Sequence, residues 1–335
     1  MNFNKKIYHA ASVILGSFFL LTSCNLNSVE DPDFAAEEIP GEQAKIAVFV
    51  SILPLQDFVE KIGAEQVIVK TLVQPGSSPV TYEPTFRQMK ELSEAKVFFR
   101  IGVPFEEVLL AKISDLNPEL TIIDLRQNIT LREMATSFSD FLIREDLQEN
   151  QIEDGHHLDH DADNHAEHQH YGKDPHIWLA PDLVKIQAAT IAAALTEIKP
   201  SQTEFFAANL QKFQAELTEL AVQIQASFAE LETNLFLVFH PAWGYFAESF
   251  GLQQIPIELM GKEPSMSQVQ RIIDFARRNE IKVIFVQKQF SQAHAQAIAT
   301  QIGASIVELD PLAQDYLANL RLISETIATN LAAHE

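Results

Sequence analysis

The chain has few basic residues and almost no cysteine. Lys and Arg together number 24 against 46 Asp and Glu, which gives the 335 residues a formal net charge of −22. A protein that binds nucleic acid needs a basic patch to neutralise phosphates, so this balance argues against that class of partner. Cys24 is the single cysteine, so no disulfide can form within the chain.

Long apolar runs are equally scarce. The one extended run, Ala10 to Leu21, follows two lysines; it is too short to span a bilayer but fits the core of a signal peptide. It ends in Leu21-Thr22-Ser23-Cys24, which resembles the signal of bacterial lipoproteins, whose cysteine receives lipid and becomes the new N-terminus. We therefore expect residues 1–23 to be a lipoprotein signal peptide and Cys24 to be the lipidation site. A plain secretory signal is the alternative.

The segment after the cysteine is acidic and poor in large apolar side chains, so residues 24–43 are expected to form a flexible tether. Without residues 1–23 the chain loses two lysines and no acids, and 22 basic against 46 acidic residues leave a net charge of −24. That charge is compatible with a cationic ligand. About 290 residues remain, enough for two lobes of ordinary domain size.

Short β-branched and aromatic runs alternate with helical patterns along these residues. Most runs are continuously apolar, which is typical of parallel strands covered on both faces. The helical patterns between them fit crossover helices, so we predict an α/β fold with two doubly wound lobes. The predicted strands are 45–50, 66–72, 96–101, 120–123, 235–239, 282–286 and 305–309, and the predicted crossover helices are 58–62, 86–95, 266–279 and 293–303.

Two longer helical patterns separate the halves. Residues 183–199 predict one helix, and residues 202 to about 232 predict a second, about 45 Å long if unbroken. Pro200 and Ser201 lie between them, with Ser201 expected as the N-cap of the second helix. The predicted layout is an N-terminal lobe over 44–180, a helical connector over 181–232 and a C-terminal lobe over 233–335. A connector of this length is expected to hold the lobes in a nearly fixed relation.

A histidine-rich segment, residues 155–170, is expected to form a mobile loop of the N-terminal lobe. Its imidazoles alternate with aspartates and a glutamate, which offers many exchangeable ligands to a metal such as zinc. We interpret it as an accessory site for transient metal capture. A solvated polar loop and a pH-responsive charge cluster are the alternatives. The histidines are His156, His157, His160, His165, His168 and His170.

Three other residues are candidates for a fixed metal site. His240 directly follows the predicted strand 235–239, and Asp310 directly follows 305–309, whereas His176 lies in a loop ahead of the predicted helix 183–199. Open α/β sheets bind ligands beyond the carboxyl ends of their strands. Two imidazoles and a carboxylate are a reasonable ligand set for a divalent metal.

The sequences around these residues resemble the zinc/manganese solute-binding proteins of ABC importers, from about Lys45 to the C-terminus. The histidine-rich segment resembles the zinc-uptake branch in particular. The motifs are Asp174-Pro-His-Ile-Trp-Leu179, Val238-Phe-His-Pro-Ala-Trp-Gly-Tyr-Phe246 and Val307-Glu-Leu-Asp-Pro-Leu312, supported by Pro75-Gly-Ser-Ser-Pro-Val-Thr-Tyr-Glu-Pro84, Glu263-Pro-Ser265 and Ile284-Phe-Val-Gln-Lys-Gln-Phe-Ser291.

The resemblance implies a metal cleft between two lobes joined by a long rigid helix, with three histidines and a carboxylate or water as the usual ligands. Carried over by position, His176, His240 and Asp310 match three of these ligands. Where the family usually has Pro-His, this chain has Pro79-Val80, and valine cannot coordinate a metal. A water, a histidine of residues 155–170 or Glu83 could take the missing place.

The expected function is therefore that of a monomeric receptor in the cell envelope, lipid-anchored on the periplasmic or extracellular face. It would capture Zn(II) and deliver it to an ABC permease and its ATPase. Mn(II) or another divalent metal as the ligand, and a periplasmic metal buffer or adhesin without a transporter, are alternatives. A zinc hydrolase is disfavoured, because the sequence has no His-Glu-x-x-His helix and no general base beside the expected ligands. We expect no enzymatic activity.

Overall fold

A computed structural model describes residues 44–134, 138, 172–258, 264–290 and 292–333, the side chains of 114–116 excepted. These residues belong to one unit that spans 34–335. The predicted signal peptide, Cys24, the tether and the histidine-rich segment lie outside the described residues.

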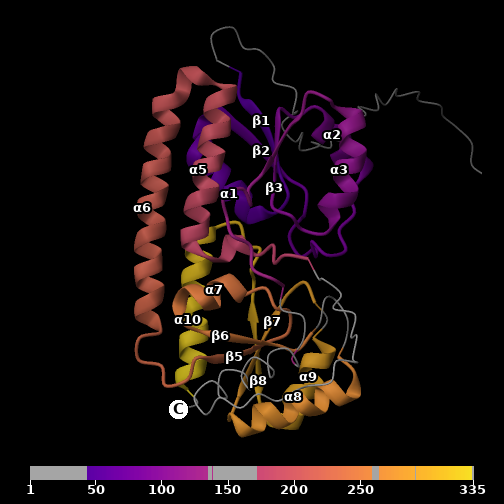
Figure 1. Ribbon diagram of the computed structural model, residues 1–335, viewed down its shortest axis with the longest axis vertical. Coiled ribbons are helices and arrows are strands. Elements are labelled where there is room, and N and C mark those ends of the chain that lie inside the picture. Colours follow the sequence, from indigo (N-terminus) through magenta and orange to yellow (C-terminus); the bar gives the residue numbers. More distant parts are fainter. Residues whose placement is uncertain (1–43, 135–137, 139–171, 259–263, 291, 334–335) are drawn as a thin grey trace, which may run out of the picture. The chain divides into compact units, whose positions relative to one another are not determined.

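The first lobe is built on a sheet of parallel strands in the order β2-β1-β3-β4. Val48 at the centre of β1 pairs with Val69 of β2 and Val97 of β3, and these apolar strands are covered by helices (Figure 1). The strands are β1 (Ile46–Val50), β2 (Val67–Thr71), β3 (Val97–Arg100) and β4 (Thr121–Asp124), and the helices are α1 (Leu53–Gly63), α2 (Phe86–Ser93) and α3 (Phe105–Leu116).

The second lobe repeats this arrangement, with parallel strands in the order β6-β5-β7-β8. Gly251 caps the C-terminus of helix α7, and its φ of 72° lies in the left-handed region that favours glycine. The prediction of two doubly wound α/β lobes is confirmed. The strands are β5 (Leu235–Val238), β6 (Gln253–Pro256), β7 (Val283–Gln287) and β8 (Ser305–Leu309), and the helices are α7 (Gly244–Phe250), α8 (Met266–Arg278) and α9 (Ala293–Ile302).

Long helices connect the lobes. Helix α5 (Pro181–Ile198) leads through the 3-10 turn η3 (Pro200–Gln202) into the 25-residue α6 (Thr203–Ser227), which packs against α5, α1 and the last helix, α10 (Tyr316–Ala332). The predicted N-cap at Ser201 is wrong, because Pro200 starts a separate 3-10 turn and Gln202 precedes α6 without a side-chain cap. None of the described helices combines the length and apolarity needed to cross a bilayer.

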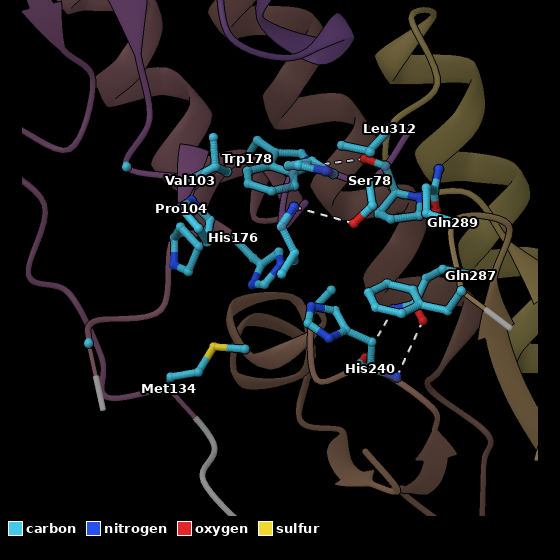
Figure 2. Close-up of a pocket in the computed structure, with 18 of the residues that line it drawn as sticks. Ser78, Val103, Pro104, Met134, His176, Trp178, His240, Gln287, Gln289 and Leu312 are labelled. Carbon is cyan, nitrogen blue, oxygen red and sulfur yellow. Dashed lines mark hydrogen bonds between the residues drawn. The ribbon is translucent and has the colours of Figure 1, made fainter. Parts of the chain in front are cut away.

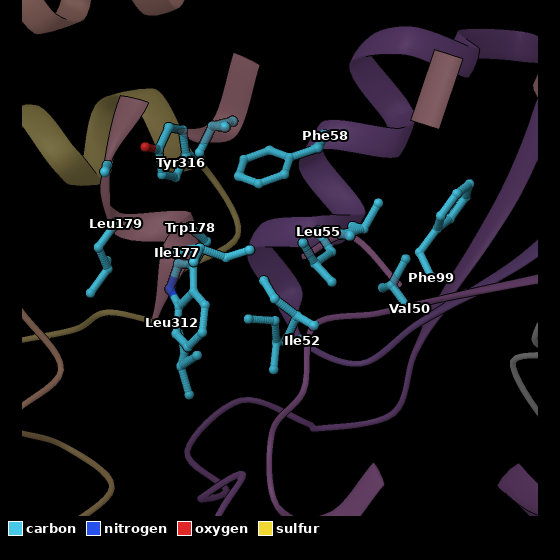
Figure 3. Close-up of a cluster of buried hydrophobic side chains, with 14 of the residues drawn as sticks. Val50, Ile52, Leu55, Phe58, Phe99, Ile177, Trp178, Leu179, Leu312 and Tyr316 are labelled. Atoms are coloured by element: carbon cyan, nitrogen blue, oxygen red, sulfur yellow. The ribbon is translucent and has the colours of Figure 1, made fainter. Parts of the chain in front are cut away.

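A shared hydrophobic core joins the two lobes. One cluster contains Val50 of the first sheet and Phe236 of the second, and a further cluster lies against α8 and α9. In Figure 3, Trp178 and Leu312 lie beside Ile52 and Leu55 at the start of α1. The short 3-10 helix η2 (Ile177–Leu179) is therefore fixed among buried residues of both lobes, immediately after His176.

Candidate metal-binding site

His240 lies at the point where the second sheet changes winding direction. It follows the end of β5, whose neighbours β6 and β7 come next in the chain on opposite sides. Ligands of open α/β sheets bind at such points. Gln287, the last residue of β7, fixes the His240 backbone: its Oε1 accepts from the His240 N–H at 3.3 Å, and its Nε2 donates to the His240 carbonyl at 3.0 Å.

His176 is held by the turn that begins η2. The buried Asp174 carboxylate accepts a hydrogen bond from the His176 backbone N–H at 3.0 Å. The same Oδ1 atom lies 2.7 Å from Nδ1 of the His176 ring. Both the backbone and the ring of His176 are thus oriented by one carboxylate two residues earlier.

The two histidines share this pattern of ring orientation. Nδ1 of His240 lies 3.0 Å from Oε2 of the buried Glu258, just as Nδ1 of His176 faces Asp174. An ionised carboxylate only accepts hydrogen bonds, so Nδ1 carries the proton in both rings and Nε2 keeps its lone pair. Metal-binding histidines in proteins are typically oriented by carboxylates in this way.

The two rings lie beside one another. Their centroids are 5.3 Å apart with an interplanar angle of 71°, and Figure 2 shows both rings in the same pocket. Phe290 stacks on His240 at a centroid distance of 4.6 Å, and Trp178 lies 5.1 Å from His176. The imidazoles are therefore packed against aromatic rings and largely shielded from solvent.

Burial favours the neutral form of His240. It lowers the pKa of the imidazole, and the nearby His176 ring acts in the same direction, whereas the Glu258 carboxylate opposes both. A neutral imidazole is the form that coordinates a metal ion.

Asp174 is in turn held by residues from another part of the chain. The Tyr245 hydroxyl, on α7, donates to the Asp174 carbonyl and accepts from the Arg132 backbone N–H, both at 3.0 Å. Burial raises the pKa of Tyr245 to about 12, so the hydroxyl keeps its proton at neutral pH. A Cβ at Gly244 would lie 2.1 Å from the Arg132 guanidinium and 3.0 Å from Asp174 Oδ2, so a side chain there would displace this support.

His176 and His240 line a cavity of about 330 Å³. Its walls are mostly apolar and include Val103, Phe290 and Val80, the residue that stands where a ligand was expected. Val80 is 36% exposed at the edge of the cavity. His176 and His240 thus share one cavity, with the hydrocarbon side chain of Val80 at its edge.

Asp310 does not line this cavity, although its hydrogen-bond partners Gln289 and Leu312 do. Its Oδ1 accepts hydrogen bonds from Gln289 Nε2 at 3.1 Å and from the Leu312 N–H at 3.0 Å, and Lys288 Nζ is 3.8 Å from Oδ2. It lines a separate cavity of about 40 Å³. Across the described part of the chain, no three His, Cys, Asp or Glu side chains form a group that could hold a metal ion. The role of Asp310 as a ligand stays a prediction.

Glu83, an alternative for the missing ligand, does not line this cavity. Glu83 lines a third cavity, of about 380 Å³, together with Val80 and Phe105. The accessory histidines and Cys24 fall outside the described residues, so their roles also remain predictions.

Sequence reasoning missed the carboxylates that orient the histidines. Asp174 lies in the same motif as His176, and the spacing of two residues could have indicated it. Glu258 follows β6 and meets His240 only because β5 and β6 pair side by side. No local pattern in the sequence connects them.

Two parallel-sheet lobes, with a ligand-sized cavity lined by two oriented imidazoles, define a solute-binding receptor for a metal ion. The chain belongs to the ZnuA family, described as zinc-uptake complex component A, periplasmic, which matches residues 48–330. A solved structure of a ZnuA deletion mutant with zinc bound is 38% identical, covering 85% of this chain and 97% of that one with a TM-score of 0.73.

Relatives of known sequence include further zinc-binding and metal-binding proteins. The high-affinity zinc uptake system protein ZnuA of Yersinia pestis is 28% identical over 278 residues, which is 82% of this chain and 85% of the relative. A putative metal-binding protein of Treponema pallidum is 26% identical over 265 residues, 78% of each chain. The zinc-binding protein AdcA of Streptococcus pyogenes is 24% identical over 310 residues, and the match spans only 58% of its length.

Proposed function

We propose that this protein is an extracytoplasmic receptor that binds Zn(II) through His176 and His240 and delivers it to the permease and ATPase of an ABC importer. One observation carries the proposal: two buried imidazoles share a cavity, and each has its Nδ1 engaged by a carboxylate. The Nε2 lone pairs are left for a metal. Family membership and the zinc-bound relative with 38% identity support the same ligand.

The chemistry of the donors favours zinc over manganese. Imidazole nitrogen suits zinc, copper and nickel, whereas manganese prefers carboxylate, carbonyl and water oxygens. The cavity offers two imidazole nitrogens, and both nearby carboxylates are turned toward the Nδ1 atoms. Capture requires no bond to be made or broken in a substrate, so the proposed role is binding without catalysis.

The remaining features of the proposal rest on the sequence. Lipid on Cys24 would hold a monomeric receptor at the membrane through the tether 24–43, and the histidines of residues 155–170 would collect ions. Residues 44–180 and 233–335 would form the two lobes on either side of the connector 181–232. Asp310 would complete the ligand set through Oδ2, because its Oδ1 already accepts from Gln289 and from the Leu312 N–H.

Competition with a zinc-chelating dye tests the metal ligands. In the metal-free protein, His176→Ala and His240→Ala should each lower zinc affinity about a hundredfold, because each removes one of two coordinating nitrogens. His294→Ala, on α9 outside the cavity, is the matched control and should bind as the unchanged protein does. Thermal unfolding of the metal-free variants separates lost ligands from lost folding. Unchanged affinity in folded His176→Ala or His240→Ala protein would refute the assignment.

A further inference from the structure

The cavity is much larger than a metal ion. Its volume of about 330 Å³ is more than twenty times the roughly 10–15 Å³ that one water molecule needs. Pockets for small organic ligands begin at roughly 300 Å³ and combine apolar walls with a few fixed polar groups. The cavity has the size and the lining of a site for a small molecule.

The protein also supplies few ligands to an ion in this cavity. Zinc in proteins is usually four-coordinate and tetrahedral. His176 and His240 provide two positions, and Val80 stands where a further histidine was expected. Within the described residues, no third His, Cys, Asp or Glu side chain joins them. A four-coordinate zinc held by these two imidazoles has two further coordination positions for other donors.

The walls provide polar and flat apolar surfaces for an organic ligand. Gln289 lines the cavity, and its Nε2 is fixed on the Asp310 carboxylate, so its Oε1 faces away from that carboxylate. In the described part of the chain this buried Oε1 atom has no hydrogen-bond donor. Trp178 and Phe290 add aromatic surface beside the two imidazoles.

We propose that the cavity takes zinc as a complex with a small amino-acid chelator, two of whose donor groups fill the two open coordination positions. The inference rests on the proposed zinc-binding function and names the form in which the ion is bound. The rest of the amino acid would lie in the free volume of the cavity, beside the wall that includes Val80.

Retention of an isotope-labelled chelator tests this directly. The full-length metal-free protein is mixed with Zn(II) and ¹⁵N-labelled L-histidine, desalted rapidly, and analysed for zinc and label. We expect about one histidine retained per zinc, in keeping with four-coordinate zinc, and none without zinc. At equal buffered free zinc, added L-histidine should raise the zinc occupancy of the protein, with an apparent gain in affinity of about tenfold or more.

A variant that restores the expected protein ligand provides the contrast. Val80→His should retain zinc without L-histidine and should retain less than about a tenth of the label, because its imidazole takes one of the positions that the chelator needs. Val222→His adds a histidine at an exposed position of α6, outside the cavity, and should behave like the unchanged protein.

The outcomes separate the two proposals. Zinc retained with no labelled histidine, at an occupancy that L-histidine does not raise, would overturn the chelator proposal and leave zinc binding intact. Retention of neither zinc nor label under any condition would overturn zinc binding itself. Equal retention of the label by the Val80→His and Val222→His variants would place the histidine outside this cavity and also overturn the inference.

Discussion

The indole Nε1 of Trp178 donates a hydrogen bond to the backbone carbonyl of Pro311 at a distance of 2.9 Å. Trp178 lies two residues after His176, and Pro311 directly follows Asp310 at the end of β8. This buried bond ties the segment that carries His176 to the second lobe. The position of His176 relative to His240 therefore depends on contacts outside the cavity as well as on the carboxylates within it.

Replacing Trp178 by phenylalanine should destabilise the protein. The buried Pro311 carbonyl loses its donor, which costs about 1–3 kcal/mol in free energy of unfolding, and the smaller ring adds a packing loss. Denaturant unfolding of the metal-free protein measures the change. Trp243→Phe removes a similarly buried indole without touching Pro311 and should leave zinc affinity unchanged, whereas Trp178→Phe should lower it. Equal zinc affinities in the two variants would show that the bond does not position His176.

The carboxylates behind the histidines should control zinc affinity without touching the ion. Glu258→Leu fills the buried site with an apolar side chain and removes the acceptor that orients the His240 ring. This variant should weaken zinc binding about 10–100-fold. Glu258→Gln can still accept through its amide oxygen and should recover part of the loss. Calorimetric titration with zinc gives both values. An equal loss of zinc affinity in the two variants would mean that the hydrogen bond accepted from Nδ1 does not control zinc affinity.

The ligand role predicted for Asp310 is open to a similar test. Because its carboxylate accepts from Gln289 and from the Leu312 N–H in a separate cavity, we expect Asp310→Asn to keep zinc affinity within about threefold. Asparagine can retain both hydrogen bonds through its amide oxygen. A loss of zinc affinity of about 10–100-fold, measured by competition with the zinc-chelating dye, would instead make Asp310 a metal ligand.

Asp57 should make the protein less stable as the pH rises. Burial raises its pKa from the ordinary value of 3.8 to about 6, although Lys61 opposes the shift. The folded state keeps the proton between these two values while the unfolded state releases it. Stability from this group is therefore complete below about pH 4 and lost as the pH rises through about 6, by at most about 3 kcal/mol.

Asp57→Asn isolates this contribution. Asparagine keeps an oxygen that can accept from the Tyr316 backbone N–H but does not titrate. Urea unfolding of metal-free protein between pH 4 and pH 7 should show a smaller fall in stability for the variant than for the unchanged chain. Parallel pH profiles would contradict the assignment.

The sequence allowed much of the fold to be predicted, for identifiable reasons. Continuous apolar runs indicated seven of the strands, and β8 has the predicted bounds, 305–309. The missed strand, β6, reads Gln-Gln-Ile-Pro and lacks such a run, since its residues are buried by pairing with β5 rather than by their own hydrophobicity. Helix α7 begins at Gly244, within the His240 motif, and its seven residues are too few for a periodic pattern to be detected.

The site was less accessible to prediction. A histidine or an aspartate after an apolar strand can be located at a sheet edge, but the direction of its side chain depends on neighbours that fold back from elsewhere. His240 is the second residue after β5, whereas Asp310 is the first residue after β8. His240 is held by Glu258 and faces the large cavity, whereas Asp310 is held by Gln289 and lines the small one. Successive side chains in a strand point to opposite faces, so this one-residue offset separates the two side chains, and β5 also lies inside the sheet whereas β8 lies at its edge.

The two imidazoles come from different segments of the fold: His176 precedes a 3-10 helix beside the start of α1, and His240 follows a strand of the second sheet. An ion held by both is a cross-link between these segments. Coordinate bonds to zinc tolerate little stretching beyond about 2.0–2.1 Å, so a small displacement of either segment breaks one of the two bonds. Such a displacement shortens the residence time of the ion without altering any ligand. Release is then governed by the dissociation rate rather than by the affinity at rest.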